Sequence, residues 1–217
     1  MKRLHLIIIL SIIASSALAG GHLKCDTVKR KDTTNKVHLP DTFVAVEMEP
    51  QFPGGIPAFS SFILKNLRYP EIANLVGLSG KVYVTFVVDK DGAVTEARPV
   101  KCIGAGCESE AVRVISMSPN WKPGVQKGRA VRVQYSVPIS FNATREKVYL
   151  KDLKKSAYGF VFAINGKYYT LDEALEKIGK SYLTTQLEEA DPFYNADNNP
   201  KFTMPDKKEV YLLKIKS

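Results

Sequence analysis

Two cysteines in a short loop are the residues best placed for covalent chemistry in this chain. Cys102 and Cys107 flank a loop that contains Gly104 and Gly106, and glycine allows the positive φ that a tightly folded loop needs. A disulfide requires Cα atoms about 4.4–6.8 Å apart. We therefore predict a Cys102–Cys107 bridge, which leaves Cys25 as an odd thiol, free or intermolecular. The spacing is not that of a Cys-x-x-Cys redox pair, and no nearby histidine completes a metal site.

Other catalytic groupings are equally hard to assemble. The histidines outside the first nineteen residues are His22 and His38, both in a polar stretch, so no Ser/His/Asp or Cys/His set falls on the folded part. The stretch Asp89-Lys90-Asp91-Gly92 has a calcium-like pattern but lacks the further oxygen ligands and distal glutamate. We expect a turn there, and a non-enzyme that needs no cofactor or metal. A pair of carboxylates that converge in a cleft is the alternative left open.

The N-terminus has the layout of a secretory signal peptide. A positive start at Lys2 and Arg3 precedes an apolar run, and Ala17-Leu18-Ala19 is a small-x-small cleavage site. We expect residues 1–19 to be cleaved and residues 20–41 to be a flexible tether. A retained membrane anchor is the alternative, but a spanning helix needs roughly 20 apolar residues. Export places the protein in an oxidising compartment.

The chain is basic throughout and not in one patch. Its formal net charge is +9, and removal of Lys2 and Arg3 lowers this to +7. Such a charge could favour nucleic acid, anionic lipid or an acidic partner. The lysines are scattered, however, and the one dense cluster comprises Lys147, Lys151, Lys154 and Lys155. We therefore expect a soluble basic protein and no nucleic-acid partner.

The clearest periodicity in the chain runs from Ala130 to Phe141. Apolar or aromatic residues alternate with polar ones and a proline, which predicts a long strand with one buried face. Pro138 has no N–H to donate to a ladder and indicates an edge strand. An edge strand can recruit an extended peptide as an extra strand. The polar side chains of Arg132, Gln134 and Ser136 are then candidates for partner contact.

The elements before this strand predict a mixed helix and sheet domain. Pro57 suits a helix start, an apolar stripe follows at helical spacing, and Tyr69-Pro70 ends the helix. We expect Trp121 to be an anchoring core residue. The other expected elements are a short strand around Val44 and Val46, a helix over 71–76, a hairpin of strands 80–88 and 93–100, and a helix over 108–117.

Several of these motifs occur in an order typical of one family. They are Phe52-Pro53-Gly54-Gly55, Tyr69-Pro70, Asp89-Lys90-Asp91-Gly92, Glu110-Ala111-Val112-Arg113, Trp121-Lys122-Pro123-Gly124 and Val137-Pro138-Ile139-Ser140-Phe141. From about Val44 to Phe141 the chain closely resembles the C-terminal domain of the TonB family. The resemblance implies an α+β fold in which two helices pack on a small antiparallel sheet, here over residues 42–145.

The resemblance also implies partners. Domains of this family grip the TonB box of outer-membrane receptors as an added strand, which makes Tyr69 and Pro70 further candidates for contact. The expected location is the periplasm. A retained N-terminal segment would anchor the chain in the inner membrane and allow contact with proton-channel partners. Energising members keep that anchor and a long Pro-rich spacer, whereas this tether has only Pro40.

Two alternatives to receptor binding stay open. A free edge strand can also pair with a second copy and form a homodimer. A cell-envelope scaffold that binds peptidoglycan or another periplasmic partner, without energy transduction, is compatible with the basic composition.

Residues 146–217 lie outside the resemblance and predict a small α+β extension. Asn165-Gly166 is a hairpin turn between strands 158–164 and 167–169. Thr170-Leu171-Asp172-Glu173 is a capping box that opens a helix through Ile178. Three prolines predict loop from Asp191 to Lys208, and residues 209–216 predict a last strand. Residues 147–155 are expected to be a linker or exposed helix.

Overall fold

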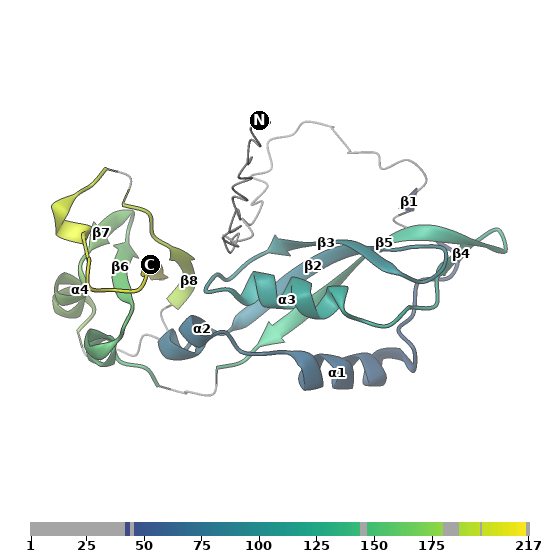
Figure 1. The fold of residues 1–217 in the computed structure, drawn as a ribbon, viewed down its shortest axis with the longest axis horizontal. Coiled ribbons are helices and arrows are strands. Elements are labelled where there is room, and N and C mark those ends of the chain that lie inside the picture. The colour runs from purple at the N-terminus through teal and green to yellow at the C-terminus, as the bar shows by residue number, and fades with distance from the viewer. Residues whose placement is uncertain (1–41, 44–45, 144–146, 180–186, 196, 216–217) are drawn as a thin grey trace, which may run out of the picture.

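The structure is a computed structural model that describes residues 42–43, 46–143, 147–179, 187–195 and 197–215. The expected signal peptide, the tether, the anchor alternative, Cys25, His22, His38 and Val44 lie outside these residues. Within the described ranges, no helix has both the length and the apolar character that a membrane crossing requires. The chain is α+β, as predicted, and forms two sheets side by side (Figure 1).

The first sheet has the strand order β1-β5-β2-β3, with β4 paired to β5. The twelve-residue periodicity is confirmed as part of β5 (Arg129–Phe141), which pairs antiparallel with β2 (Gly80–Val88) from Val133 to Phe141. The expected hairpin is formed by β2 and β3 (Val94–Lys101). The sheet is not wholly antiparallel, because β1 (Thr42–Phe43) runs parallel to β5.

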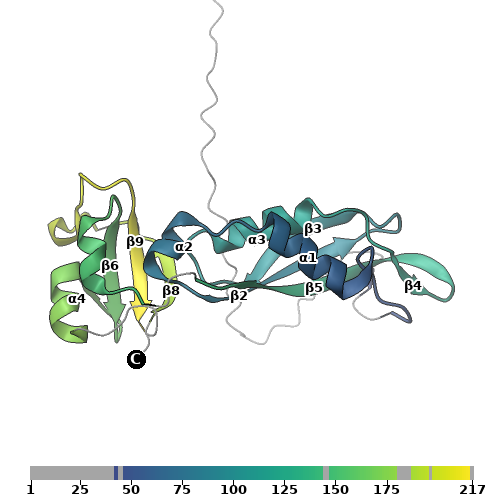
Figure 2. The same ribbon diagram turned by 90° about the horizontal axis from the view of Figure 1, so that it is seen from below.

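Three helices pack on one face of this sheet (Figures 1 and 2). They are α1 (Gly55–Asn66), α2 (Glu71–Val76) and α3 (Cys107–Ser116). Figure 1 shows α3 across the middle of the sheet and α1 towards the β5 side. The core faces of α2 and α3 are fully buried, whereas α1 has no fully buried residue. One flank of the apolar core therefore lies under a loosely covering helix.

The core lies between the helices and the matching faces of β2 and β5. Val82, Val84, Phe86 and Val88 stand opposite Ile139, Val137, Tyr135 and Val133, and side chains directly opposite each other share one face of a sheet. All of these are buried except Tyr135, which is half-buried. Trp121 is 5% exposed and packs against the ring of Phe86, which confirms its expected place in the core.

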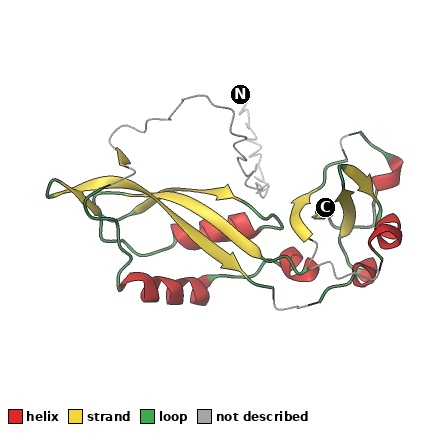
Figure 3. Ribbon diagram, turned by 180° about the vertical axis from the view of Figure 1, so that it is seen from behind, coloured by secondary structure: helices red, strands yellow, loops and turns green. Residues whose placement is uncertain are grey.

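The second sheet has the order β7-β6-β9-β8, and Figure 3 shows its strands apart from those of the first sheet. The predicted hairpin is confirmed as β6 (Gly159–Ile164) and β7 (Lys167–Tyr169), and the capping box at Thr170 opens α4 (Leu171–Ile178). The last strand is β9 (Val210–Ile215). The expected linker contains the 3₁₀ helix η1 (Leu150–Lys155), whose Leu150 and Leu153 are 1% exposed.

The expected loop from Asp191 to Lys208 is only partly correct. It contains the end of β8 (Leu187–Pro192) and the 3₁₀ helix η2 (Pro200–Phe202). Lys214 on the neighbouring β9 contacts the carboxylates of Glu189 and Asp191. Glu189 and Asp191 are acidic residues that disfavour a strand, and Lys214 on the neighbouring strand neutralises their charge.

Backbone hydrogen bonds join the two sheets. In β8, the Ala190 N–H donates to Ile103 C=O at 3.1 Å and its C=O accepts from Ala105 N–H at 2.5 Å. The buried Glu108 holds the loop that contains Ile103 and Gly104. Its Oε1 accepts hydrogen bonds from the N–H groups of both residues, each at 2.7 Å. Residues 103–105 thus act as a short extra strand beside β8.

The same loop overturns the predicted Cys102–Cys107 bridge. Cys102 is disulfide-bonded, but Cys107 is a free, fully buried thiol. Cys107 is the first residue of α3, and its side chain belongs to the core. The loop folds back as expected, but it turns the Cys107 side chain inward.

Candidate functional site: a strand edge beside an apolar groove

The register of β5 shows which of its backbone groups face outward. Pro138 pairs with Tyr83 of β2, and a proline cannot belong to a pair that exchanges two N–H bonds. In an antiparallel ladder such pairs alternate with pairs that exchange none. The odd residues of β5 from Val133 therefore bond to β2, while the N–H and C=O groups of Gln134, Ser136 and Ser140 point to the opposite side.

Part of that outer side is occupied by β1. The parallel register sets Phe43 opposite Val133, which brings the Gln134 amide against β1, since parallel partners bond to the residues that flank their counterpart. β4 (Gly124–Gln126) pairs with Arg129 to Val131 through a two-residue turn and lies on the β2 side of β5, because the odd residues of β5 face both strands. Beyond these pairings, no strand of the described residues pairs with the outer edge of β5 from Ser136 to Phe141.

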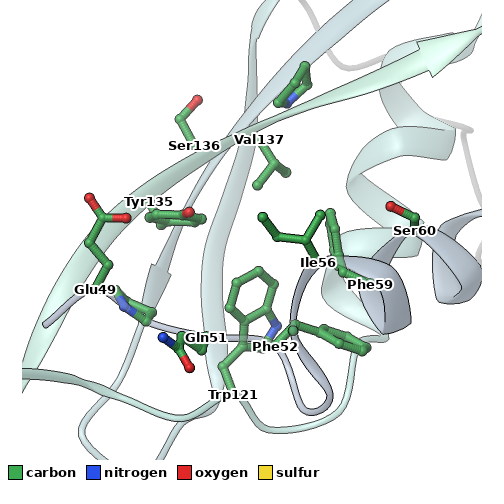
Figure 4. A pocket seen from close by; sticks show the side chains of 13 residues that line it. Glu49, Gln51, Phe52, Ile56, Phe59, Ser60, Trp121, Tyr135, Ser136 and Val137 are labelled. Carbon is green, nitrogen blue, oxygen red and sulfur yellow. The ribbon is translucent and has the colours of Figure 1, made fainter.

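An apolar groove of about 650 Å³ lies along this edge (Figure 4). Figure 4 shows Ile56 and Phe59 of α1 reaching towards Val137 and Trp121, with Tyr135 beside them. The remaining lining comes from residues 49–52, Gly55, Ser60, Ser136 and Pro138. A volume of this size lies within the roughly 300–1,000 Å³ range of ligand pockets.

The floor of the groove is rigid. The Trp121 ring lies 5.3–5.8 Å from the rings of Phe52, Phe59, Phe86 and Tyr135, and its Nε1 donates to Ser118 Oγ at 3.1 Å. The near wall is held by reciprocal backbone bonds between Gln51 and Lys122, at 3.0 and 2.8 Å. The groove is therefore assembled before any partner arrives.

The polar-face candidates from the sequence have three different surroundings. Ser136 is exposed and lines the groove, and Gln134 is half-buried just beyond β1. Arg132 is held across the sheet by ion pairs, with Nε 2.6 Å from Asp89 and Nη2 2.7 Å from Glu96. Asp89 also accepts from Thr95 Oγ1, so this carboxylate is engaged within the turn and the sheet.

Tyr69 and Pro70 lie away from the groove. The Tyr69 hydroxyl donates to Leu78 C=O, and its ring stands 5.9 Å from that of Phe141 at the far end of β5. Burial is the main reason that the pKa of Tyr69 is raised to about 12. Pro70 is the N-cap of α2. These contacts give both residues structural roles, and partner contact by Tyr69, Pro70 or Arg132 stays a prediction.

The groove itself was missed at the sequence level. Phe59 is expected in a helical core stripe that does not include Ile56, but α1 has no fully buried residue and Ile56 is 81% exposed. The one available signal was Phe52-Pro53-Gly54-Gly55, a shaped loop directly before an apolar helix start.

The fold and site together define a small α+β module with an open strand edge and an adjoining apolar groove. Residues 65–143 match the family model described as Gram-negative bacterial TonB protein C-terminal, so the resemblance to this domain is confirmed over that stretch. No curated protein matches the chain.

Two solved structures are similar to part of the chain. Both are NMR solution structures of the Helicobacter pylori TonB C-terminal domain. One is 22% identical with a TM-score of 0.31 and covers 42% of this chain and 95% of that one. The other is 25% identical with a TM-score of 0.32 and covers 43% and 89%.

The family match indicates a TonB-like role in transport at the cell envelope. The family is one of non-enzymatic envelope proteins that generally interact with outer-membrane receptors. These statements concern residues 65–143, and the sheet formed by residues 147–215 lies outside them.

Proposed function

We propose that this chain is a periplasmic TonB-like protein that binds the TonB box of an outer-membrane receptor by strand addition to β5. The observation that carries the proposal is the outer edge of β5 from Ser136 to Ser140, whose outward backbone groups lack a described strand partner. A visiting strand would bond to Ser136 and Ser140 and to the Pro138 carbonyl. Each such bond contributes about 0.5–1.5 kcal/mol.

The other edge of the sheet is a poorer docking place. In β3, Glu96 has φ of +54° and the ladder to β2 shifts register beside it. Pro99 removes a donor, and Arg98 and Lys101 are exposed. Bulges, proline and charge are the features that blunt edge strands, whereas β5 keeps an unbroken register along β2. The difference favours β5 as the receiving edge.

The proposal assigns the chain four parts. Residues 1–19 are a cleaved signal peptide, residues 20–41 a tether, residues 42–145 the receptor-binding module and residues 146–217 a docked extension. Gln134 and Ser136 contact the peptide, and Arg132, Tyr69 and Pro70 support the strand from its two ends. Retention of the first segment would instead anchor the module at the inner membrane beside proton-channel partners.

An envelope scaffold without energy transduction is the second candidate. It is favoured by one observation: the second sheet is joined to the first by backbone bonds at Ala190 and offers a surface outside the family match. Pull-down from envelope extracts with residues 147–215 intact and deleted separates a scaffold from a receptor binder, because receptor capture requires β5 alone.

The test is a titration of the ¹⁵N-labelled mature chain with a TonB-box peptide. We expect amide shift changes along residues 134–141. The matched control is the same peptide N-methylated at alternate residues, which removes backbone donors and keeps every side chain. Shift changes that spare 134–141, or equal binding of the methylated peptide, would contradict strand addition.

A further inference from the structure

The groove beside β5 is lined by large apolar side chains. Four large apolar side chains, those of Ile56, Phe59, Trp121 and Tyr135, surround a space of about 650 Å³. Trp121 and Val137 are almost fully buried at its floor, whereas Ile56 at its rim is 81% exposed. An apolar hollow with an exposed apolar rim is suited to one large apolar side chain.

The groove lies where an added strand would place its side chains. Residues that stand opposite each other in a sheet project to the same face. A strand laid against Ser136 and Pro138 would therefore send alternate side chains to the helix face, beside Tyr135 and Val137. That face opens into the groove, while the intervening side chains would lie on the exposed face with Ser136.

Resting on the proposed function, we infer that the partner segment carries a branched aliphatic or aromatic anchor that enters the groove between α1 and β5. Its neighbours in the segment alternate towards solvent. A charged residue is excluded at the anchor position, because nothing at the apolar floor would pair with it. Glu49 at the groove mouth disfavours an acidic residue next to the anchor.

An extended peptide fits this surface better than a lipid chain or a second copy. An acyl chain could fill the groove but would cover the outward N–H of Ser136 without accepting from it. A second copy would have to pair the same edge, where Pro138 removes one donor from each strand. A separate peptide satisfies both the edge and the groove.

The test uses a series of seven-residue peptides that differ at one position. Capped peptides of alternating valine and threonine carry leucine, phenylalanine, alanine, lysine or glutamate at the central helix-face position. Trp121 is the only tryptophan in the chain, so its emission reports groove filling while ¹⁵N shifts at 134–141 report edge pairing. Leucine and phenylalanine should bind about tenfold or more tightly than alanine, and lysine and glutamate more weakly than alanine.

Two variants of α1 provide a matched pair. Ile56 and Leu64 are both 81% exposed on the same helix, but only Ile56 lines the groove. Ile56→Glu should remove the preference for leucine over alanine and leave the fold intact. Leu64→Glu should leave both affinities unchanged.

The outcomes separate this inference from the proposed function. Edge shifts with equal affinity for all five peptides would overturn the anchor and leave strand addition standing. No edge shift with any peptide would overturn both. Trp121 emission that responds to phosphatidylglycerol vesicles and not to peptides, or a dimer that Ile56→Glu dissociates, would overturn the peptide as the occupant.

Discussion

Pro138 of β5 lies directly opposite Tyr83 of β2 in the antiparallel ladder. This pairing puts the proline nitrogen on the outer side of β5, where a hydrogen bond within the sheet is not needed. The residue therefore costs the folded sheet no bond and limits what can pair with the edge from outside.

Pro138→Ala should restore an outward donor at little cost to the fold. We expect a loss of about 0.4–1 kcal/mol in the free energy of unfolding, from greater freedom of the unfolded chain, and increased self-association. Urea titration and sedimentation velocity measure the two effects. A variant that stays monomeric at all concentrations and is more stable than the parent would place the nitrogen on the β2 side, where the new N–H adds a ladder bond, and would contradict an outward-facing residue 138.

The junction between the two sheets depends on Gly104. Its φ is +88°, and a Cβ there would lie 2.0 Å from the Ala190 carbonyl oxygen. Gly104→Ala should cost about 2–4 kcal/mol, from left-handed strain of about 1–2 kcal/mol and weakened bonds to β8. Amide hydrogen exchange should accelerate at Ala105 and Ala190.

Gly166 supplies the control for this substitution. It also has positive φ, +74°, but open space surrounds the position of its Cβ. Gly166→Ala should therefore show only the strain of about 1–2 kcal/mol, with unchanged exchange at Ala105 and Ala190. Equal effects of the two variants would mean that the backbone contact does not join the sheets.

The Cys107 thiol should be unreactive in the folded protein. Burial, with the nearby carboxylates of Glu108 and Glu110, raises its pKa, and the thiolate is the reactive form. Iodoacetamide at pH 8 should modify Cys107 only after denaturation, as read by peptide mass spectrometry without reduction. Recovery of a Cys102–Cys107 cross-linked peptide would contradict the structure.

Stability should fall at alkaline pH. Burial raises the pKa of Cys107 and raises that of Tyr69 to about 12. The unfolded chain then loses these protons first, so each contribution is full below the unfolded pKa and declines above it. The free energy of unfolding should begin to fall at about pH 8.5, where the thiol of the unfolded chain ionises, and should fall more steeply from about pH 10, where its tyrosine ionises.

Cys107→Ala isolates the thiol in this pH profile. The variant should lose the part of the decline between about pH 8.5 and 10 and keep the steeper part above it. Denaturant titrations across this range give the profile. An unchanged decline in the variant would assign the effect to other groups.

Local patterns in the sequence were sufficient for most of the first sheet. The alternation of β5 and the Asp89–Gly92 turn each depend on neighbouring residues, as does the Thr170 capping box beside the second sheet, and the Pro138 edge follows from the chemistry of one residue. Strand β8 was missed because Glu189 and Asp191 are acceptable only beside Lys214, which lies more than twenty residues further along the chain.

Neither the groove nor the cysteine pairing could be predicted from neighbouring residues in the sequence. The groove joins three separated segments, and the Gln51–Lys122 bridge that brings two of them together spans most of the domain. The pairing of Cys102 depends on which way α3 turns the Cys107 side chain. Neither fact has a local signature.

The most direct measurement of the central claim is residue-resolved amide hydrogen exchange of β5, with and without a TonB-box peptide. In the free chain, Ser136 and Ser140 should exchange rapidly, and Tyr135, Val137 and Ile139 slowly. Peptide should slow Ser136 and Ser140 and leave the odd residues unchanged. Slow exchange at Ser136 and Ser140 without peptide, or no slowing when it binds, would contradict an open edge on β5.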